Sequence, residues 1–151
     1  MPSARVSGTC FVDTSILLYL RDPLVPAKRE AAMRWVSALA SRDLLVISPQ
    51  VLSEYAANVL ERFKHVPFDV LLADLSAMQV WCRALTGPTL AAEAALVHRE
   101  WGFAFSNSAL IAAAHAFGCQ LFLSEDLHHG QHVDGIEVVN PFLAGPERFE
   151  I

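Results

Sequence analysis

The chain has 151 residues, enough for one domain with a sizeable core, and we expect a single domain over residues 1–151. It is apolar, with 54% hydrophobic residues, 18% charged residues and a mean hydropathy of +0.36, so we expect some apolar surface to contact a partner. The formal net charge of -5 and the pI near 5.6 exclude a protein held on nucleic acid by bulk positive charge alone.

The cysteines and the apolar runs indicate the compartment. Cys10, Cys82 and Cys119 are odd in number, far apart and set among apolar residues, which favours buried free thiols in a reducing environment. The start, residues 1–8, has a single arginine and no apolar stretch behind it, so it does not resemble a secretory signal. No run approaches the roughly 18 apolar residues of a membrane span. We therefore expect a cytoplasmic protein without a membrane partner.

Prolines and apolar runs divide the first half of the chain into elements. Asp22-Pro23 ends a helical segment, because proline disfavours a continuing helix. Pro26 can open the next helix, and Ser48-Pro49 is typical of an N-cap followed by proline in the first turn. The pattern predicts strands at 9–12 and 44–47, and helices at 15–20, 26–41 and from Pro49 through about residue 60.

The second half continues this alternation, with Gly87-Pro88 as a break and Gly118 as a helix stop. The pattern predicts helices at 67–77, 89–101 and 106–117, strands at 120–123 and 136–139, and a further strand candidate at 79–85. Strands that alternate with helices favour right-handed crossovers. We therefore predict an α/β fold, with a mostly parallel central sheet of four to five strands flanked by helices on both faces.

Three acids occupy corresponding places in this pattern. Asp13 follows the first strand, Asp126 follows the strand at 120–123, and Glu54 lies early in the helix after the second strand. Ligands of such sheets bind beyond the carboxyl ends of the strands, so the three carboxylates should converge. Oxygen-rich clusters suit Mg²⁺ or Mn²⁺. Taken singly, Asp13 can be a helix cap, Glu54 a solvent-facing residue and Asp126 the start of a turn.

Five segments, in order and over nearly the whole chain, resemble the signature segments of PIN-domain ribonucleases, and most closely those of VapC-type toxins. They are Phe11-Val12-Asp13-Thr14-Ser15, Val51-Leu52-Ser53-Glu54, Ala109-Leu110-Ile111-Ala112-Ala113-Ala114, Leu123-Ser124-Glu125-Asp126-Leu127 and Val138-Val139-Asn140-Pro141-Phe142.

The resemblance implies a PIN-like three-layer fold and an endoribonuclease that uses Mg²⁺ or Mn²⁺ to hydrolyse phosphodiester bonds of cellular RNA. It also implies a homodimer and a small antitoxin protein that blocks the site. By residue, Asp13, Glu54 and Asp126 match metal-binding acids, Ser15 matches a hydroxyl that supports the first acid, and Ser124 matches a hydroxyl that lines the site.

The chain departs from the family at Ser108, where an acid normally begins the Ala-Leu-Ile-Ala helix. A hydroxyl there can hold a water or cap the helix but brings no charge, so we count Ser108 among the candidate catalytic residues. Glu125 or Asn107 are candidates to compensate for the missing charge. The alternatives are a catalytically weakened PIN-like domain that binds RNA or a protein partner, and a phosphatase-like metal hydrolase on the same sheet.

Other polar and aromatic residues have two interpretations each. His128, His129 and His132 have a spacing that can bind zinc, but Gly130 favours a loop and solvated or RNA-facing imidazoles. His115 is expected in the core or at an interface more than as a ligand, and Trp35, Trp81 and Trp101 are expected there more than in stacking on RNA bases. Two apolar helix faces, at 25–39 and 51–60, are candidate dimer or antitoxin surfaces. Basic residues that can contact phosphates are Arg21, Lys28, Arg29, Arg34, Arg62, Lys64 and His65.

Overall fold

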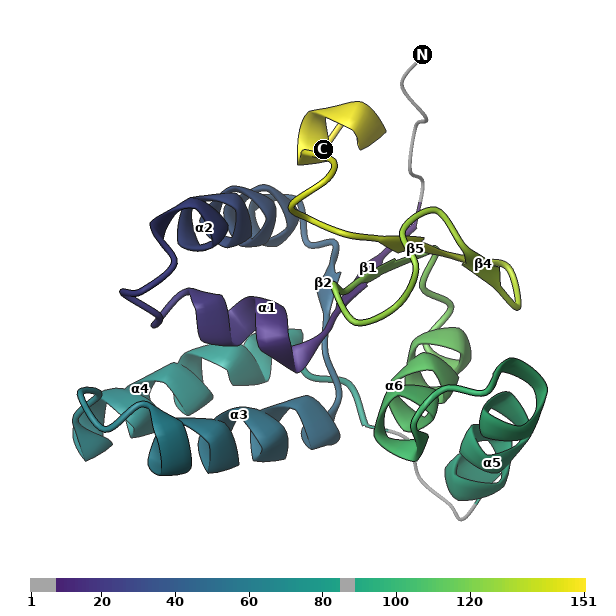
Figure 1. The fold of residues 1–151 in the computed structure, drawn as a ribbon, viewed down its shortest axis with the longest axis horizontal. Coiled ribbons are helices and arrows are strands. Elements are labelled where there is room, and N and C mark those ends of the chain that lie inside the picture. Colours follow the sequence, from purple (N-terminus) through teal and green to yellow (C-terminus); the bar gives the residue numbers. More distant parts are fainter. Residues whose placement is uncertain (1–7, 85–88) are drawn as a thin grey trace.

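The five strands form one sheet in the order β2-β1-β3-β5-β4 (Figure 1). In this computed structural model, which describes residues 8–84 and 89–151, the strands β1, β2, β3 and β5 run parallel, and only β4 is antiparallel to its neighbour. The predicted mostly parallel sheet is therefore confirmed. The strand bounds are Cys10–Val12 (β1), Leu45–Val46 (β2), Leu121–Leu123 (β3), His132–Val133 (β4) and Ile136–Val139 (β5).

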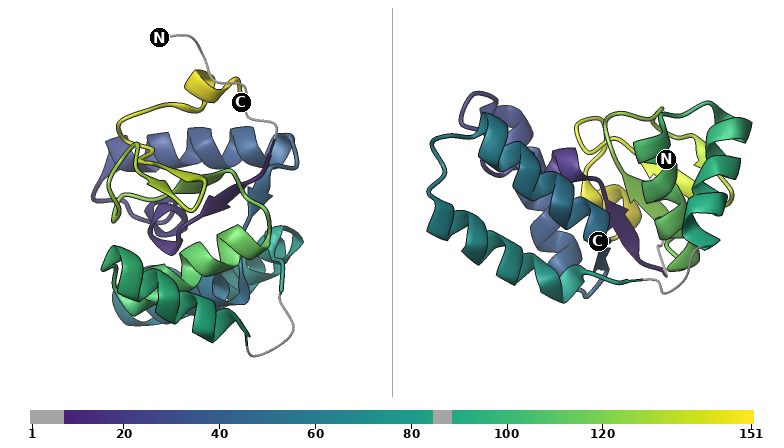
Figure 2. Two further views of the ribbon diagram at one scale, coloured as in Figure 1. Left: turned by 90° about the vertical axis from the view of Figure 1, so that its right-hand side faces the viewer. Right: turned by 90° about the horizontal axis from the view of Figure 1, so that it is seen from below.

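Helices cover both faces of the sheet. Figure 2 shows α2 on one face and α5 with α6 on the opposite face, which confirms the three-layer α/β architecture. Prolines stand in the first turn of α2 and α3, and Gly118 adopts a positive φ of 72° just beyond α6, as predicted. The helices are Thr14–Tyr19 (α1), Pro26–Ser41 (α2), Pro49–Arg62 (α3), Phe68–Met78 (α4), Thr89–Trp101 (α5) and Phe105–Ala116 (α6), with 3-10 turns at Gln79–Trp81 (η1) and Pro146–Phe149 (η2).

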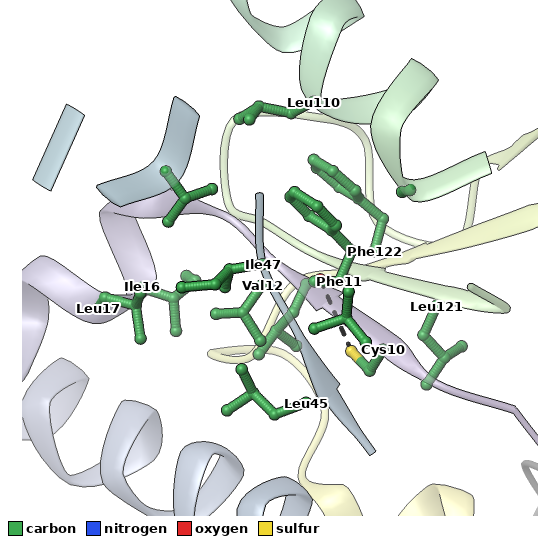
Figure 3. Close-up of a cluster of buried hydrophobic side chains, with 14 of the residues drawn as sticks. Cys10, Phe11, Val12, Ile16, Leu17, Leu45, Ile47, Leu110, Leu121 and Phe122 are labelled. Atoms are coloured by element: carbon green, nitrogen blue, oxygen red, sulfur yellow. Dashed lines mark hydrogen bonds between the residues drawn. The ribbon is translucent and has the colours of Figure 1, made fainter. Parts of the chain in front are cut away.

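The core is centred on β1, whose three residues are fully buried. Phe11 stacks on Phe122 of β3 with ring centroids 5.5 Å apart (Figure 3). Trp35 is fully buried, as predicted, and its Nε1–H donates to the Ala144 carbonyl at 2.9 Å. The three cysteines are free thiols, and Cys10 and Cys119 are buried. A strand buried on both faces explains the apolar run that ends at Asp13.

Some predictions are wrong or lie outside the described residues. Within the strand candidate at 79–85, Gln79–Trp81 is a 3-10 turn, and among the described residues of this stretch Cys82 alone forms a bridge to the sheet, to Ile47. Short apolar runs do not distinguish strand from helix by periodicity, and Val80 in this run is 81% exposed. Residue 85, the Gly87-Pro88 break and the interpretation of residues 1–7 lie outside the described ranges.

The remaining findings concern the exposure of His115, Trp81 and Trp101 and the length of the helices. His115 is exposed on α6, so it is not a core residue, and its place at an interface stays a prediction. Trp81 and Trp101 pack half-buried against the core. Over residues 8–84 and 89–151, none of the helices has the length and apolar character needed to cross a membrane.

Candidate active site

Asp13 lies at the carboxyl end of β1 and is the N-cap residue of α1, but its side chain makes no capping hydrogen bond to that helix. The residue is only 3% exposed. Its Oδ2 accepts a 2.7 Å hydrogen bond from Ser124 Oγ, and the Asp126 N–H donates to the same Ser124 oxygen at 3.1 Å. The loop after β3 therefore orients Asp13, and the cap interpretation does not account for its side chain.

Glu54 is held on α3 by two donors. Its Oε2 accepts a 2.7 Å hydrogen bond from Thr14 Oγ1, and its Oε1 accepts one of 2.9 Å from Gln50 Nε2. Gln50 also donates to the Ser106 carbonyl at 3.0 Å, which ties this part of α3 to the start of α6. Neither donor was predicted from the sequence, although Thr14 directly follows Asp13 and Gln50 precedes Glu54 by one helical turn.

The three acids influence one another electrostatically. The pKa of Asp13 is raised to about 6, mainly by burial. Repulsion from Asp126 and Glu54 also raises this pKa, whereas the hydrogen bond from Ser124 lowers it. Desolvation also raises the pKa of Asp126, with Glu125 and then Glu54 contributing. Among the described residues, none of these three carboxylates forms an ion pair with a lysine, arginine or histidine. The edge of the sheet thus carries negative charge that the described part of the protein leaves uncompensated.

The donor chemistry at this edge fits a hard divalent cation. Carboxylate and hydroxyl oxygens are the groups that Mg²⁺ and Mn²⁺ prefer, and a bound cation would offset the repulsion among the acids. In the described ranges, no three His, Cys, Asp or Glu side chains are gathered tightly enough to hold one ion as they now stand. The residues therefore supply the ligand types and charge, while the carboxylates would have to approach one another on binding.

Ser108 and the compensating candidate Glu125 both have other partners. Ser108 is fully buried, and its Oγ donates to the Phe103 carbonyl at 3.4 Å while its N–H bonds to Ala104. Glu125 accepts a 2.8 Å hydrogen bond from Lys28 and a second one from the Tyr19 hydroxyl. The charge of Glu125 is thus already balanced. Half-buried Asn107 adds an amide and no charge.

Ser15 makes no side-chain hydrogen bond in the described structure, and His128 and His132 are exposed, which agrees with the favoured interpretation of solvated imidazoles. Ser15 Oγ is buried without a hydrogen-bond partner in the described structure, so the observed support of Asp13 comes from Ser124. His129 Nδ1 accepts the Asn140 N–H at 3.0 Å, and His132 begins β4. Within the described residues, the three histidines form no metal-binding group with one another or with a nearby cysteine or acid.

The buried Asp13 predicts a pH dependence for the metal-free protein. Its pKa is about 6 in the folded state against 3.8 ordinarily, so the folded state binds the proton more tightly. The associated stability is present below pH 4 and is lost as the pH rises through 6. We expect a loss on the order of 2–3 kcal/mol in the free energy of unfolding. Urea unfolding in chelator from pH 4 to 7.5 measures it, and parallel curves for the wild type and Asp13→Asn would contradict it.

The chain has an α/β fold with acids at the carboxyl ends of two adjacent parallel strands, and solved structures with a similar fold are known. Neither a protein-family model nor a curated protein sequence matches the chain. Among solved structures, a toxin–antitoxin complex from Klebsiella pneumoniae is 14% identical, with a TM-score of 0.63 over 88% of this chain and 98% of that chain.

Two further solved structures belong to VapC-type systems. VapC20 of Mycobacterium tuberculosis, described as a sarcin-ricin loop cleaving toxin, is 21% identical, with a TM-score of 0.57 over 76% of this chain and 87% of that chain. VapBC2 of Rickettsia felis, bound to a promoter DNA fragment, is 12% identical, with a TM-score of 0.62 over 86% and 96%. The resemblance to VapC-type PIN domains is thereby confirmed at the level of the fold.

Proposed function

We propose that the protein is a metal-dependent endoribonuclease and the toxin component of a toxin–antitoxin pair. The observation that carries this proposal is the buried carboxylate of Asp13, electrostatically coupled to Glu54 and Asp126 without a cationic partner in the described structure. Such a buried carboxylate lowers the stability of the folded protein, and strongly shifted pKa values of this kind concentrate at functional sites. The fold shared with VapC-type toxins supports the same assignment.

In this mechanism Asp13, Glu54 and Asp126 would hold Mg²⁺ or Mn²⁺. A bound divalent ion polarises a phosphodiester and lowers the pKa of water for attack on phosphorus. The protein's own contribution is orientation: Ser124 directs Asp13, while Thr14 and Gln50 direct Glu54.

The basic residues divide into two groups. Arg21, Lys28 and Arg34 form ion pairs with Asp74, Glu125 and Glu147. Arg29, Arg62 and Lys64 have no such ion pair in the described part of the chain, and these are the groups we assign to phosphate contacts.

The partners proposed with this function are cellular RNA, a cognate antitoxin protein and a second copy of the chain, in the cytoplasm. Exposed apolar side chains support protein contacts, among them Met33 on α2 and Leu60 on α3, the two helices that carry the predicted surfaces. Co-expression with the product of a neighbouring short reading frame, followed by mass measurement of the purified complex, tests both protein contacts.

Incubation of the purified protein with total RNA tests the activity. We expect cleavage with defined, sequenced ends in Mg²⁺ or Mn²⁺ and none in chelator. Intact RNA in both metals would contradict the proposal, as would turnover of small phosphate esters without RNA cleavage, which the phosphatase-like alternative predicts.

Two adjacent acids should respond differently to neutralisation. Asp126→Asn removes a proposed metal ligand and should lower cleavage at least tenfold, whereas Glu125→Gln removes a carboxylate already engaged by Lys28 and should change it less than about threefold. Initial rates at saturating Mg²⁺ measure both. Equal losses would show that Asp126 has no special role, and the melting temperature of each variant controls for folding.

A second candidate function is a weakened PIN-like domain that binds RNA or protein without efficient cleavage. The observation that favours it is Ser108, which is neutral, fully buried and bonded to the Phe103 backbone.

A further inference from the structure

A cavity of about 340 Å³ adjoins the acids. It lies between α1, the end of α3 and the loop after β3, and Figure 1 shows α1 and α3 side by side. Ser15 and Asp126 line the cavity on the side of the candidate active site, and the other lining residues are Leu18, Tyr19, Asp22, Arg62, Phe63 and Glu125. Its volume is sufficient for a single planar heterocycle.

The walls combine aromatic rings and three carboxylates with an arginine that has no acidic partner among the described residues. Of the carboxylates, Glu125 is paired with Lys28, Asp22 accepts the Leu24 N–H, and Asp126 is a proposed metal ligand. The Arg62 guanidinium carbon lies 6.0 Å from the centre of the Phe63 ring, and Arg62 itself is exposed. Neighbouring cations differ from it, because Arg21 and Lys28 are engaged by Asp74 and Glu125. Aromatic faces together with an available guanidinium suit a nucleobase and its phosphate, through stacking and charge pairing.

Arg62 is aligned with Glu54 along one face of α3. Glu54, Asn58 and Arg62 follow at intervals of four residues, and hydrogen bonds join them: Asn58 Nδ2 donates to the Glu54 carbonyl at 2.7 Å, and Arg62 donates to Asn58 Oδ1. The helical rise places Arg62 about 12 Å along the axis from Glu54. This separation suits a flanking nucleotide better than the phosphate at the acids.

The geometry points to a nucleobase-binding subsite for single-stranded RNA in this cavity. Phe63 and Tyr19 stack on a base that flanks the cleaved bond, and Arg62 pairs with a neighbouring phosphate. Since a base inside a duplex remains stacked between its neighbours, the subsite admits only an unpaired nucleotide. This inference rests on the proposed function and assigns its substrate class to named residues.

Binding measurements in the non-cleaving Asp13→Asn background test the subsite. Fluorescence anisotropy with a labelled single-stranded oligoribonucleotide should show that added Phe63→Leu weakens affinity about fivefold to a hundredfold. Phe63→Trp, which keeps a stacking face, should stay within about threefold of the background. An abasic nucleotide at the bound position should cause the same loss as Phe63→Leu, and the two losses should not add.

Matched controls separate stacking, charge and packing. Phe68→Leu alters a 64% exposed ring that lines a different cavity also bordered by Phe63, and it should not change affinity. Arg62→Gln should reduce the slope of log affinity against log salt by about 0.7, whereas Arg99→Gln on α5 makes the same charge change and should not. Phe63→Leu should leave this slope unchanged. Melting temperatures identify any variant whose loss reflects unfolding.

Three outcomes would overturn the subsite: undiminished binding by Phe63→Leu, an equal loss for Phe68→Leu, or an equal effect on duplex and single-stranded RNA. The Arg62→Gln salt slope keeps the test decisive if Phe63 variants unfold, because an unchanged slope also rejects the assignment. Failure of the Asp13→Asn background to bind any RNA would instead reject the proposed function, and the subsite with it.

Discussion

Asp13→Asn is expected to lower RNA cleavage by about a hundredfold or more while the protein remains folded. The substitution keeps the shape of the side chain and removes the charge that we assign to the metal. A ligand that stabilises a metal at the reacting phosphate contributes several kcal/mol to catalysis, and each 1.36 kcal/mol corresponds to a factor of ten in rate. Initial rates on a single-stranded substrate, measured over a Mg²⁺ titration, quantify the loss.

Stability distinguishes this loss of chemistry from a loss of structure. Because Asp13 is 3% exposed and burial raises its pKa, the ionised carboxylate costs folding energy in metal-free protein at neutral pH. Asp13→Asn should therefore melt at the same temperature as the wild type, or higher, in chelator. Addition of Mg²⁺ should raise the melting temperature of the wild type only.

Ser124→Ala serves as a control with an intermediate expected loss of cleavage. It leaves the charge of Asp13 in place and removes the hydroxyl that orients it, so we expect a loss of about tenfold, between the wild type and Asp13→Asn. An Asp13→Asn protein that is folded and cleaves RNA at the wild-type rate would show that this carboxylate is not a metal ligand.

The fold was largely predictable because its strands are apolar runs ended by polar residues. β1 is buried on both faces, and Asp13 interrupts its apolar run where the strand ends. β4 has only two residues, His132 and Val133, one of them exposed, so it produces no apolar run. Its pairing depends on the turn to β5 and not on its own composition.

The site was predictable in its acids and less so in their partners. Asp13, Asp126 and Glu54 follow from topology, since parallel strands end at one edge. Which hydroxyl contacts Asp13 depends on side-chain direction. The resemblance assigned this support to Ser15 and placed Ser124 only along the site, whereas Ser124 makes the observed hydrogen bond. Likewise, the Lys28 contact that neutralises Glu125 joins residues 97 positions apart, which a local pattern does not reveal.

Ser108→Asp is expected to lower the free energy of unfolding in chelator by about 2–5 kcal/mol. The rate of RNA cleavage should stay within about threefold of the wild type. The new carboxylate would replace a fully buried hydroxyl that donates to the Phe103 carbonyl, so a donor is lost and a charge is buried beside an acceptor. For a chain of this length, each kcal/mol corresponds to a melting shift of about 2–4 °C. Thermal unfolding in chelator and in Mg²⁺, with cleavage rates alongside, measures both effects.

Two variants at the start of α6 control for volume and for charge. Ser108→Asn adds similar volume without charge, and Asn107→Asp adds the same charge one residue earlier, at a half-buried position where the helix N-terminus favours an acid. If Ser108→Asp is unstable in chelator, regains its stability in Mg²⁺ and cleaves RNA more than tenfold faster than the wild type, then the carboxylate has reached the metal. That outcome would contradict a three-acid site and establish the wild-type protein as a weakened nuclease, because a single acid would have restored the missing ligand.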